Sequence, residues 1–255
     1  MNADRPSPKL SVVTASFNAL EGLRATVESV AGQGFSEIEH IVVDGGSDDG
    51  TREYLESLGD KVRWISEPDR GIADALNKAT ELARGDYVLV LQAEDRFASP
   101  DSLEQASRFL DGTDIVSFDV AVERDGKVER FASRGLGEKL EWFMAVPHQG
   151  AFVRRDLLER LGGYDLELKV GMDYEMMLRA KRAGASCRVV GEVLSLMPAT
   201  GISARRDWSS LRARLDENRK IQTRHVQSDT RLIAQALFWK PYLLYKRLRH
   251  LRARA

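Results

Sequence analysis

The chain has 255 residues, 43% hydrophobic and 30% charged, a composition typical of a globular protein with a sizeable core. Its 38 lysine and arginine residues nearly balance 39 acidic residues, so no global field points to nucleic acid as a partner. The single cysteine, Cys187, excludes an internal disulfide and a multi-cysteine zinc cage. Neither a signal-peptide core nor a run of ~18 apolar residues is present, so we expect a cytoplasmic protein.

The first hundred residues alternate predicted strands with predicted helices. Strand–helix alternation with apolar strands predicts an α/β fold with a Rossmann-like, mostly parallel sheet covered on both faces. The helix after the second strand is expected to be capped by Ser47 or Asp48. Runs of apolar and β-branched residues predict the four strands at 10–17, 40–47, 62–67 and 86–92.

Beyond residue 98 this alternation weakens. The sequence predicts a helix capped by Ser99 and then a β-hairpin that turns at Asp125 and Gly126. A strand and a short helix, a second helix ending at Gly184 and a further strand follow. From Asp207 onward the chain is helical and rich in arginine. We therefore expect a single α/β domain over residues 1–206 and a basic helical C-terminal extension over 207–255.

Polar residues follow all four N-terminal strands. The carboxyl ends of parallel strands meet at one edge of a sheet, and ligands bind there, so we expect one crevice. The stretch LVLQAEDRF runs from an apolar strand into Glu94 and Asp95. Such a pair suits either a solvated turn or a site for a divalent cation and a phosphate.

Three common site signatures are absent from the sequence. The first strand is followed by TASFNA instead of G-x-G-x-x-G, and neither a P-loop nor a G-x-S-x-G motif occurs. A nucleotide could still bind through carboxylates and a metal. Asp44, at the end of the second strand, can accept a hydrogen bond from the imide N–H of uracil. Asp74 and Asn77, three residues apart, share a helix face near the crevice.

Six segments in a fixed order resemble family 2 glycosyltransferases, over about residues 10–203. The resemblance implies an inverting enzyme of the A-type glycosyltransferase fold with a nucleotide-sugar donor, in a branch that builds bacterial surface polysaccharides. We expect a UDP-linked donor and a glycan or lipid-linked glycan acceptor. The segments are SVVTASFN, IVVDGGSDDGT, EPDRGIADALNKA, ARGDYVLVLQAED, PHQGAFVRRDLL and GGYDLELKVGMDYEMMLRA.

The resemblance also implies a metal site and a catalytic base. Asp95 matches the aspartate that binds Mn²⁺ or Mg²⁺ at the donor diphosphate; Glu94 stands where the family usually has aspartate, and Gln92 where many members have a first one. Asp173 matches the base that takes the acceptor proton. Glu175 lies two residues on, about 200° around a helix, so only one of these two carboxylates can face the site.

Further positions follow from the same resemblance. The segment 200–206 is expected near the acceptor, and Met176 and Met177 are expected in the core beneath the base. The implied donor-binding residues are Thr14, Phe17, Asn18 and Asp44 for the nucleoside, and Asp74, Asn77 and Glu94 for the diphosphate and sugar, with His148 and Gln149 on the acceptor side.

Two alternative functions stay open. A sugar nucleotidyltransferase could use a similar sheet and a carboxylate-held metal, but it should carry a glycine- and lysine-rich loop after the first strand, and TASFNALEG has no lysine. A non-catalytic nucleotide-sugar-binding module would have no reason to keep Asp44, Asp95 and Asp173 together.

The C-terminal stretch FWKPYLLYKRLRHLRARA interleaves aromatic residues and leucines with basic residues. It predicts an amphipathic helix that Pro241 could begin. Such a helix can lie on an anionic membrane, here the inner face of the cell membrane, or dock on the domain with a solvated basic face.

Overall fold

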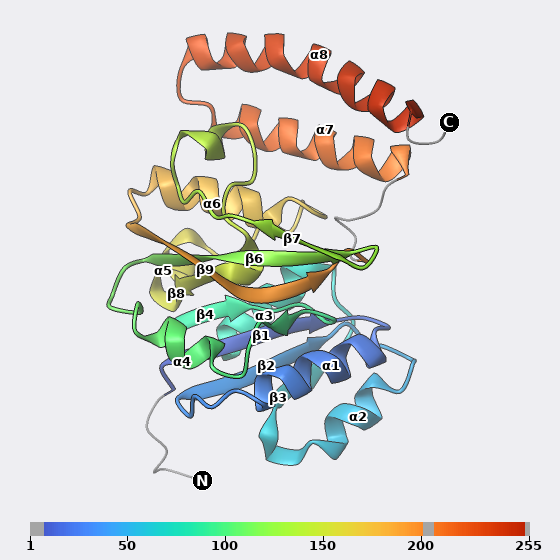
Figure 1. Cartoon of the computed structure of the whole chain (residues 1–255), viewed down its shortest axis with the longest axis vertical. Helices are drawn as coiled ribbons and strands as arrows, with labels where there is room; N and C mark the ends of the chain where they lie inside the picture. The colour runs from blue at the N-terminus through green and yellow to red at the C-terminus, as the bar shows by residue number, and fades with distance from the viewer. Residues whose placement is uncertain (1–7, 201–206, 253–255) are drawn as a thin grey trace.

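The computed structural model describes residues 8–200 and 207–252. Within these residues nine strands form one sheet in the order β3-β2-β1-β4-β8-β6-β9-β5, with β7 paired to β6 (Figure 1). The strands are β1 Leu10–Ser16, β2 Ile38–Asp44, β3 Arg63–Ser66, β4 Tyr87–Val90, β5 Arg96–Phe97, β6 Ile115–Arg124, β7 Lys127–Phe131, β8 Ala151–Arg154 and β9 Cys187–Pro198. The helices are α1 Leu20–Ala31, α2 Thr51–Ser57, α3 Ile72–Leu82, α4 Ser102–Ser107, α5 Arg155–Leu161, α6 Met172–Arg182, α7 Trp208–His225 and α8 Asp229–Arg252, with 3₁₀ turns η1 Gly59–Lys61, η2 Glu138–Glu141 and η3 His148–Gly150.

The predicted α/β fold is confirmed. Strands β3, β2, β1 and β4 are parallel neighbours, as strand–helix alternation requires. The rest of the sheet is mixed, because β8 joins β4 and β6 antiparallel while β9 runs parallel to β6. The hairpin β6–β7 turns where predicted: Asp125 and Gly126 have φ of 51° and 71°, the left-handed pair that a tight two-residue turn needs.

The core lies on both faces of the sheet, and successive residues of β1 serve opposite faces. Val13 belongs to the cluster formed with α3, α5 and α6, whereas Val12 belongs to a second cluster with Phe152 and residues of α4. Met176 and Met177 of α6 are fully buried in the first cluster. Their predicted place in the core is confirmed.

Two helix starts differ from the prediction. Gly50, with φ of 90°, stands at the N-cap position of α2, so neither Ser47 nor Asp48 caps that helix. The helix expected after Ser99 begins later, at Ser102, because the chain first closes a turn in which the Ser99 N–H donates to the Ser102 hydroxyl over 3.0 Å. In both cases the polar side chain stabilises the turn that precedes the helix.

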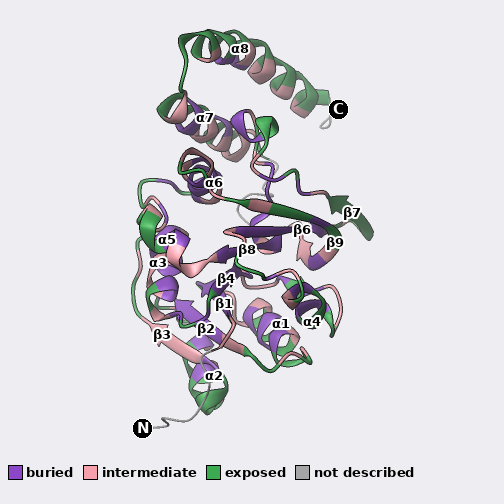
Figure 2. Ribbon diagram, turned by 90° about the vertical axis from the view of Figure 1, so that its left-hand side faces the viewer, coloured by how far each residue is buried: buried purple, intermediate pink, exposed green. Residues whose placement is uncertain are grey.

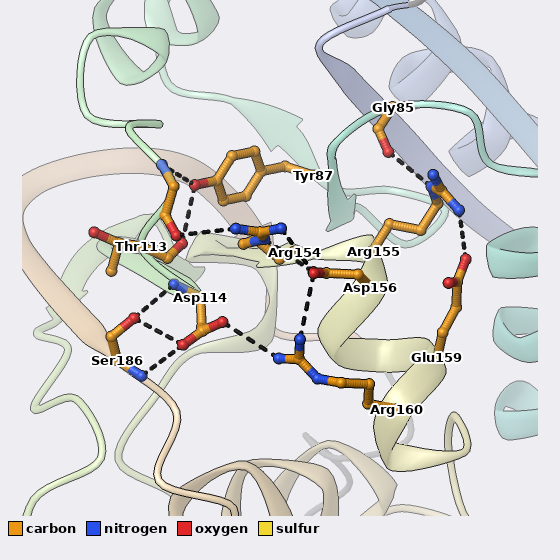
Figure 3. Close-up of polar contacts among 11 residues, drawn as sticks. Gly85, Tyr87, Thr113, Asp114, Arg154, Arg155, Asp156, Glu159, Arg160 and Ser186 are labelled. Atoms are coloured by element: carbon orange, nitrogen blue, oxygen red, sulfur yellow. Dashed lines mark hydrogen bonds and ion pairs between the residues drawn. The ribbon is translucent and has the colours of Figure 1, made fainter.

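The corner between β8 and α5 is fixed by ion pairs (Figure 3). Arg154 contacts Asp156 over 2.7 Å, and Arg155 pairs with Glu159 and donates to the Gly85 carbonyl over 3.1 Å. Arg154 also lies opposite the first residue of β4 in the strand register. This network therefore lies at the amino edge of the parallel strands, away from their carboxyl ends, and holds α5 on the sheet.

The C-terminal helices form the outermost layers: α7 lies beside α6, and α8 covers α7 (Figure 1). Trp239 of α8 is 2% exposed and donates its indole N–H to the Gln222 side chain over 2.9 Å, and Phe238 packs edge-on against Trp142. Pro241 lies inside α8, so its predicted role as a helix start is wrong. The helix has already begun at Asp229, and Trp239, two residues before the proline, is docked on the protein, so Pro241 lies within α8. Except for Thr200, the segment 200–206 lies outside the described residues, and the domain boundary there stays a prediction.

Candidate active site

The carboxyl ends of four parallel strands meet at one edge of the sheet, as predicted. Ser16 at the end of β1 is the register partner of Asp44, which is in turn the partner of Ser66 at the end of β3. Val90 ends β4 beside Val13. The polar segments that follow these strands are therefore neighbours, although they are far apart in the sequence.

Asp95 lies in a closed turn after β4. Its N–H donates to the Gln92 carbonyl and its Oδ2 accepts the Gln92 N–H, both over 3.0 Å. The side chain is only 4% exposed, and burial raises its pKa to about 7; hydrogen bonds from Gln92 and Gln149 lower that pKa, and the charge of Glu94 raises it. No lysine or arginine of the described residues acts on this carboxyl. A buried carboxylate without a cationic partner suits a bound cation.

Glu94 stands at the outer side of the same turn. Its φ is 82°, a left-handed conformation that is strained for a side chain of this size. The backbone N–H of Glu94 donates to the Gly22 carbonyl over 3.0 Å, its side chain packs where Gly22 has no Cβ, and the Thr200 hydroxyl donates to its carboxylate. Local contacts of α1 thus set this geometry.

The donor set fits Mn²⁺ or Mg²⁺. Both are hard cations that accept few protein oxygens when phosphate and water complete the shell. Across residues 8–200 and 207–252, no three histidine, cysteine or acidic side chains gather as a metal cluster. Asp95 and Glu94 would therefore hold a cation only together with oxygens from a ligand.

Asp44 is fully buried. Its carboxylate accepts the N–H groups of Gly46 and Ser47 over 3.2 and 3.0 Å and the Ser66 hydroxyl over 2.7 Å, and the Ser47 hydroxyl also donates to it. With these four internal bonds Asp44 shapes the turn after β2 and ties it to β3, and its direct pairing with a uracil imide stays a prediction. Backbone donors compete for the carboxylate more strongly than sequence position alone suggests.

Phe17 is 63% exposed, which excludes a core role. Its ring lies beside Gly45, where an added Cβ would come within 3.3 Å of Cδ2 and within 2.7 Å of the Asp69 carboxylate. An open aromatic face, a bare stretch of backbone and a carboxylate thus line one surface. The sequence analysis missed Asp69; its only signal was its place in the polar segment after the third strand.

Two other residues, Ser16 and Asn18, lie at or just after the end of β1. Asn18 adopts φ of 47°, donates its N–H to the Ser47 hydroxyl over 2.8 Å and accepts the Asp48 N–H over 3.0 Å, so it joins the segments after β1 and β2. Ser16 is buried, and within the described residues its hydroxyl has no hydrogen-bond partner. An unpaired buried hydroxyl next to a crevice is available to a ligand.

Thr14 does not face the crevice. It is fully buried, donates its hydroxyl proton to the Leu91 carbonyl over 2.7 Å and lies 3.0 Å from His40 Nε2. Because that proton is used, His40 must donate to Thr14. Burial lowers the pKa of His40 to about 4, so the ring is neutral. Thr14 thus links β1 to β2 and to the residue after β4, and its contact with a nucleoside stays a prediction.

Asp74 and Asn77 share α3, as predicted, but their side chains are already engaged. Asp74 accepts the N–H and a guanidinium N–H of Arg70 over 3.2 and 3.0 Å, and the Arg70 hydrogen bond lowers its pKa. Asn77 accepts the Tyr164 N–H over 2.7 Å and donates to the Tyr164 carbonyl over 2.9 Å, filling the space beside Gly163. Asp74 therefore positions the loop after β3, and Asn77 positions the loop before α6.

His148 and Gln149 link the two halves of the site. Gln149 donates to the Asp95 carboxyl, and His148 Nε2 lies 2.9 Å from the Tyr164 hydroxyl. Burial lowers the pKa of His148 to about 4, so the ring is neutral. The pKa of Tyr164 is raised by burial and further by the charge of Asp173. Gln149 thus contacts the Asp95 carboxyl, and the adjacent His148 binds Tyr164, on which the charge of Asp173 acts.

Asp173 stands in the first turn of α6, half-buried, and its Oδ1 accepts the Tyr174 N–H over 2.7 Å. Burial raises its pKa to about 6, and the charge of Glu217 adds to that rise. A helix N-terminus favours the ionised form, but here desolvation outweighs it. Glu175 turns away from Asp173 and binds Arg179 over 2.6 Å, so the prediction that the two carboxylates diverge is confirmed.

The fold is that of the A-type glycosyltransferases, as its similarity to solved structures shows. Residues 11–162 match the model of Glycosyl transferase family 2, and residues 87–245 match that of Glycosyl transferase family group 2. The chain belongs to glycosyl transferase family 2, which confirms the resemblance found in the sequence.

Relatives and solved structures agree with this assignment. An uncharacterised glycosyltransferase of Mycobacterium tuberculosis is 38% identical over 214 residues, 80% of each chain. The putative teichuronic acid biosynthesis glycosyltransferase TuaG of Bacillus subtilis is 38% identical over 107 residues, 40% of this chain and 42% of TuaG. The mannosyltransferase PcManGT of Pyrobaculum calidifontis, solved in complex with GDP-Man and Mn²⁺, has a TM-score of 0.69 at 21% sequence identity. The match covers 97% of this chain and 75% of the PcManGT chain. S. aureus TarS 1–349 in complex with UDP has a TM-score of 0.66 at 18% sequence identity, and the match covers 87% of this chain and 68% of the TarS chain.

Proposed function

We propose that this protein transfers a sugar from a UDP-linked donor to a hydroxyl of a bacterial surface glycan or its lipid-linked precursor, with inversion at the anomeric carbon. One observation carries the proposal. Asp95 is buried just after a strand end, has no cationic partner among the described residues and contacts Gln149, while the adjacent His148 binds Tyr164, on which the charge of Asp173 acts.

The donor side rests on the surface between β1, β2 and β3. Phe17 offers a face on which a base can stack, and Asp69 and the backbone at Gly45 offer polar groups at its edge. The choice of UDP draws on S. aureus TarS, which has been solved with UDP and with UDP-GlcNAc. Mn²⁺ or Mg²⁺ held by Asp95 and Glu94 would supply the charge that the leaving diphosphate needs.

On the acceptor side of the site, Asp173 acts as the base. As the acceptor oxygen attacks the anomeric carbon, its proton passes to the Asp173 carboxylate, and the bond to the diphosphate breaks on the opposite face of the sugar. His148 is neutral, so in this arrangement it orients Tyr164 and takes no proton at neutral pH. Inversion follows from a single displacement with one base.

A product assay tests the proposal. The purified protein is incubated with UDP-sugars, Mn²⁺ and a lipid-linked glycan acceptor, and in parallel with UTP or CTP and sugar phosphates. We expect UDP release that depends on the acceptor and on the cation. Pyrophosphate release in the second arm would instead identify a nucleotidyltransferase, and binding of UDP-sugar without product in either arm would identify a binding module.

The outer face of α8 supports a membrane-bound acceptor. Five leucine and isoleucine residues of α8 are between 50% and 71% exposed, and their spacing places them on the side of the helix opposite buried Trp239. Figure 2 shows that much of α8 is exposed. Lys240 and Arg247 flank them, and Asp229 is the one acidic residue in α8. No helix of the described residues is long and apolar enough to cross a membrane. We call these five residues the outer stripe: Ile233, Leu237, Leu244, Leu248 and Leu251.

The outer stripe is proposed to lie on an anionic bilayer. The aromatic residues Phe238, Trp239 and Tyr242, which the sequence placed on the same amphipathic helix, instead pack inward against the protein. Apolar insertion and electrostatic attraction therefore come from different residues. Each leucine contributes about 1.5–3 kcal/mol of binding free energy if it is fully buried in the bilayer interface. Each basic residue near the membrane surface adds about 1 kcal/mol.

Flotation with vesicles checks this. The full chain is expected to float with phosphatidylglycerol vesicles at low salt and much less with zwitterionic ones. The triple variant Leu237→Glu, Leu244→Glu, Leu248→Glu should stay at the bottom of the gradient, whereas Val128→Glu, at an equally exposed position on β7, should float normally. Flotation of the triple variant would refute the proposal, and so would a concentration-dependent dimer in which the stripe is covered by a second copy.

A further inference from the structure

The C-terminal extension contributes a carboxylate to the segment from which α6 begins. Glu217 of α7 accepts three consecutive backbone N–H groups: Lys169 through Oε1 over 2.7 Å, and Val170 and Gly171 through Oε2 over 3.0 and 2.8 Å. These are the last three residues before α6, and Asp173 is the second residue of that helix. A side chain from a later helix thus binds the backbone directly in front of the proposed base.

This arrangement replaces a local helix cap. Gly171 occupies the N-cap position of α6 and has no side chain with which to accept an N–H. It also has no room for one, because an added Cβ would lie 2.7 Å from Ile221 Cδ1 on α7. The close approach lets the Glu217 carboxylate reach the free N–H groups, where negative charge is favourable.

Three more contacts hold the C-terminal end of α7, beyond Glu217. Arg224 pairs with Asp165 over 2.5 Å at the beginning of the loop before α6. His225 Nε2 lies 2.9 Å from Glu175, in the first turn of α6 itself, and the Arg182 guanidinium donates to the His225 carbonyl over 2.8 Å. Because α7 is held both to the loop and to α6, it defines the position of the residues between them.

Glu217 also acts on Asp173 electrostatically. Among the described residues, the ionisable groups that interact with Asp173 are Glu217 from α7 and Tyr164 from the preceding loop. Burial keeps Tyr164 protonated and therefore neutral. The one negative charge acting on Asp173 thus comes from α7, and it favours the protonated form that Asp173 reaches after taking a proton.

We propose that Glu217 is a positioning residue for Asp173: its carboxylate holds the backbone segment that directly precedes the base and thereby aims it. This inference rests on the proposed function of Asp173. It adds that the extension, residues 207–255, belongs to the active site and is not only a membrane anchor.

The experiment compares Glu217→Gln and Glu217→Ala with Asp216→Asn in the full-length chain. Asp216 is the adjacent carboxylate on α7, has a side chain that is 39% exposed and pairs with Arg212 within its own helix. Three readouts are used: kcat and KM for donor and acceptor as a function of pH, direct NMR titration of the Asp173 carboxyl carbon, and hydrogen exchange of the amides of residues 169–171.

Glu217→Ala is expected to lower kcat by about tenfold to a hundredfold with little change in donor KM, because the base is displaced but the donor surface is intact. The amides of 169–171 should exchange faster. Glu217→Gln keeps a hydrogen-bond acceptor but loses the charge, so the pKa of Asp173 falls and the acid limb of the rate profile moves to lower pH. Asp216→Asn should match the wild type in all three readouts.

The outcomes separate this inference from the proposed function. If Asp173→Asn retains normal turnover, the assignment of the base fails whatever Glu217 does. If Asp173→Asn is inactive but Glu217→Ala leaves kcat unchanged, Glu217 does not position the base. Normal exchange of the 169–171 amides in Glu217→Ala would overturn the backbone part of the inference without any measurement of activity.

Discussion

Asp173→Asn is expected to lower kcat by about 10²–10⁴-fold while donor affinity barely changes. The amide keeps the shape of the carboxyl and can still accept the Tyr174 N–H, but it cannot take a proton from the acceptor. Steady-state kinetics combined with calorimetric binding of UDP would measure both effects. Near-normal turnover of this variant would overturn the assignment of the base.

The pH dependence of the wild type follows from the same residue. A base must be ionised to act, and burial raises the pKa of Asp173 to about 6, so kcat should fall as the pH drops through that value. The effect on stability has the opposite sign. An acid with a raised pKa in the folded state costs stability once the pH exceeds its unfolded value, so Asp173→Asn should not lower the Tm at pH 8.

Glu175→Gln is the control for Asp173→Asn, and the contacts of Glu175 in the structure alter the effect expected of this substitution. Helical geometry alone predicts a mild effect, since Glu175 points away from Asp173. Glu175 is nevertheless buried and paired with Arg179 and His225, so the substitution leaves a partly buried Arg179 without its carboxylate partner. We expect a lower Tm, with a smaller loss of kcat than in Asp173→Asn and no shift of the acid limb.

Asp95→Ala is expected to reduce transfer by roughly 10³-fold, since a bound cation contributes several kcal/mol to a reaction that releases diphosphate. Donor binding in the presence of Mn²⁺ should weaken as well. Glu94→Ala should cost less, because Glu94 lies at the outer side of the turn and is held there by Gly22 and Thr200.

The measurement is titration of UDP with and without Mn²⁺, together with kinetics in the presence of a chelator. In wild type the cation should tighten UDP binding, and in Asp95→Ala it should not. The Tm without ligand serves as the control for folding. A wild-type enzyme that keeps full activity in excess chelator would contradict the metal site at Asp95 directly.

The parallel half of the fold could be predicted because its signals are local. Each of β1 to β4 is a short apolar run followed by polar residues, and each helix between them has its own periodicity. The predicted meeting of the four strand ends needs only the parallel order. The helix starts near Ser47 and Ser99 were predicted less well, because a serine stabilises a preceding turn as readily as a helix.

The site could be predicted only where a residue's partners lie in its own motif. Asp173 and Glu175 were separated by the helical angle alone. The sequence does not indicate the internal partners that Thr14 and Asp44 have in the structure, which include the His40 ring for Thr14 and the Ser66 hydroxyl for Asp44. No local pattern indicates which internal groups will occupy a polar side chain that the sequence places at a crevice.

The cap that α7 places on α6 has a consequence for the order in which the chain matures on the ribosome. Synthesis proceeds from the N-terminus, and local units fold as they emerge. The four parallel strands emerge early and need only α1 to α3 between them. The N–H groups of Lys169 to Gly171, by contrast, bind Glu217, which is synthesised only after β9 is complete. A nascent chain therefore forms the crevice of the parallel strands before the start of α6 acquires its final partner, and stalled or C-terminally clipped copies are left in that intermediate condition.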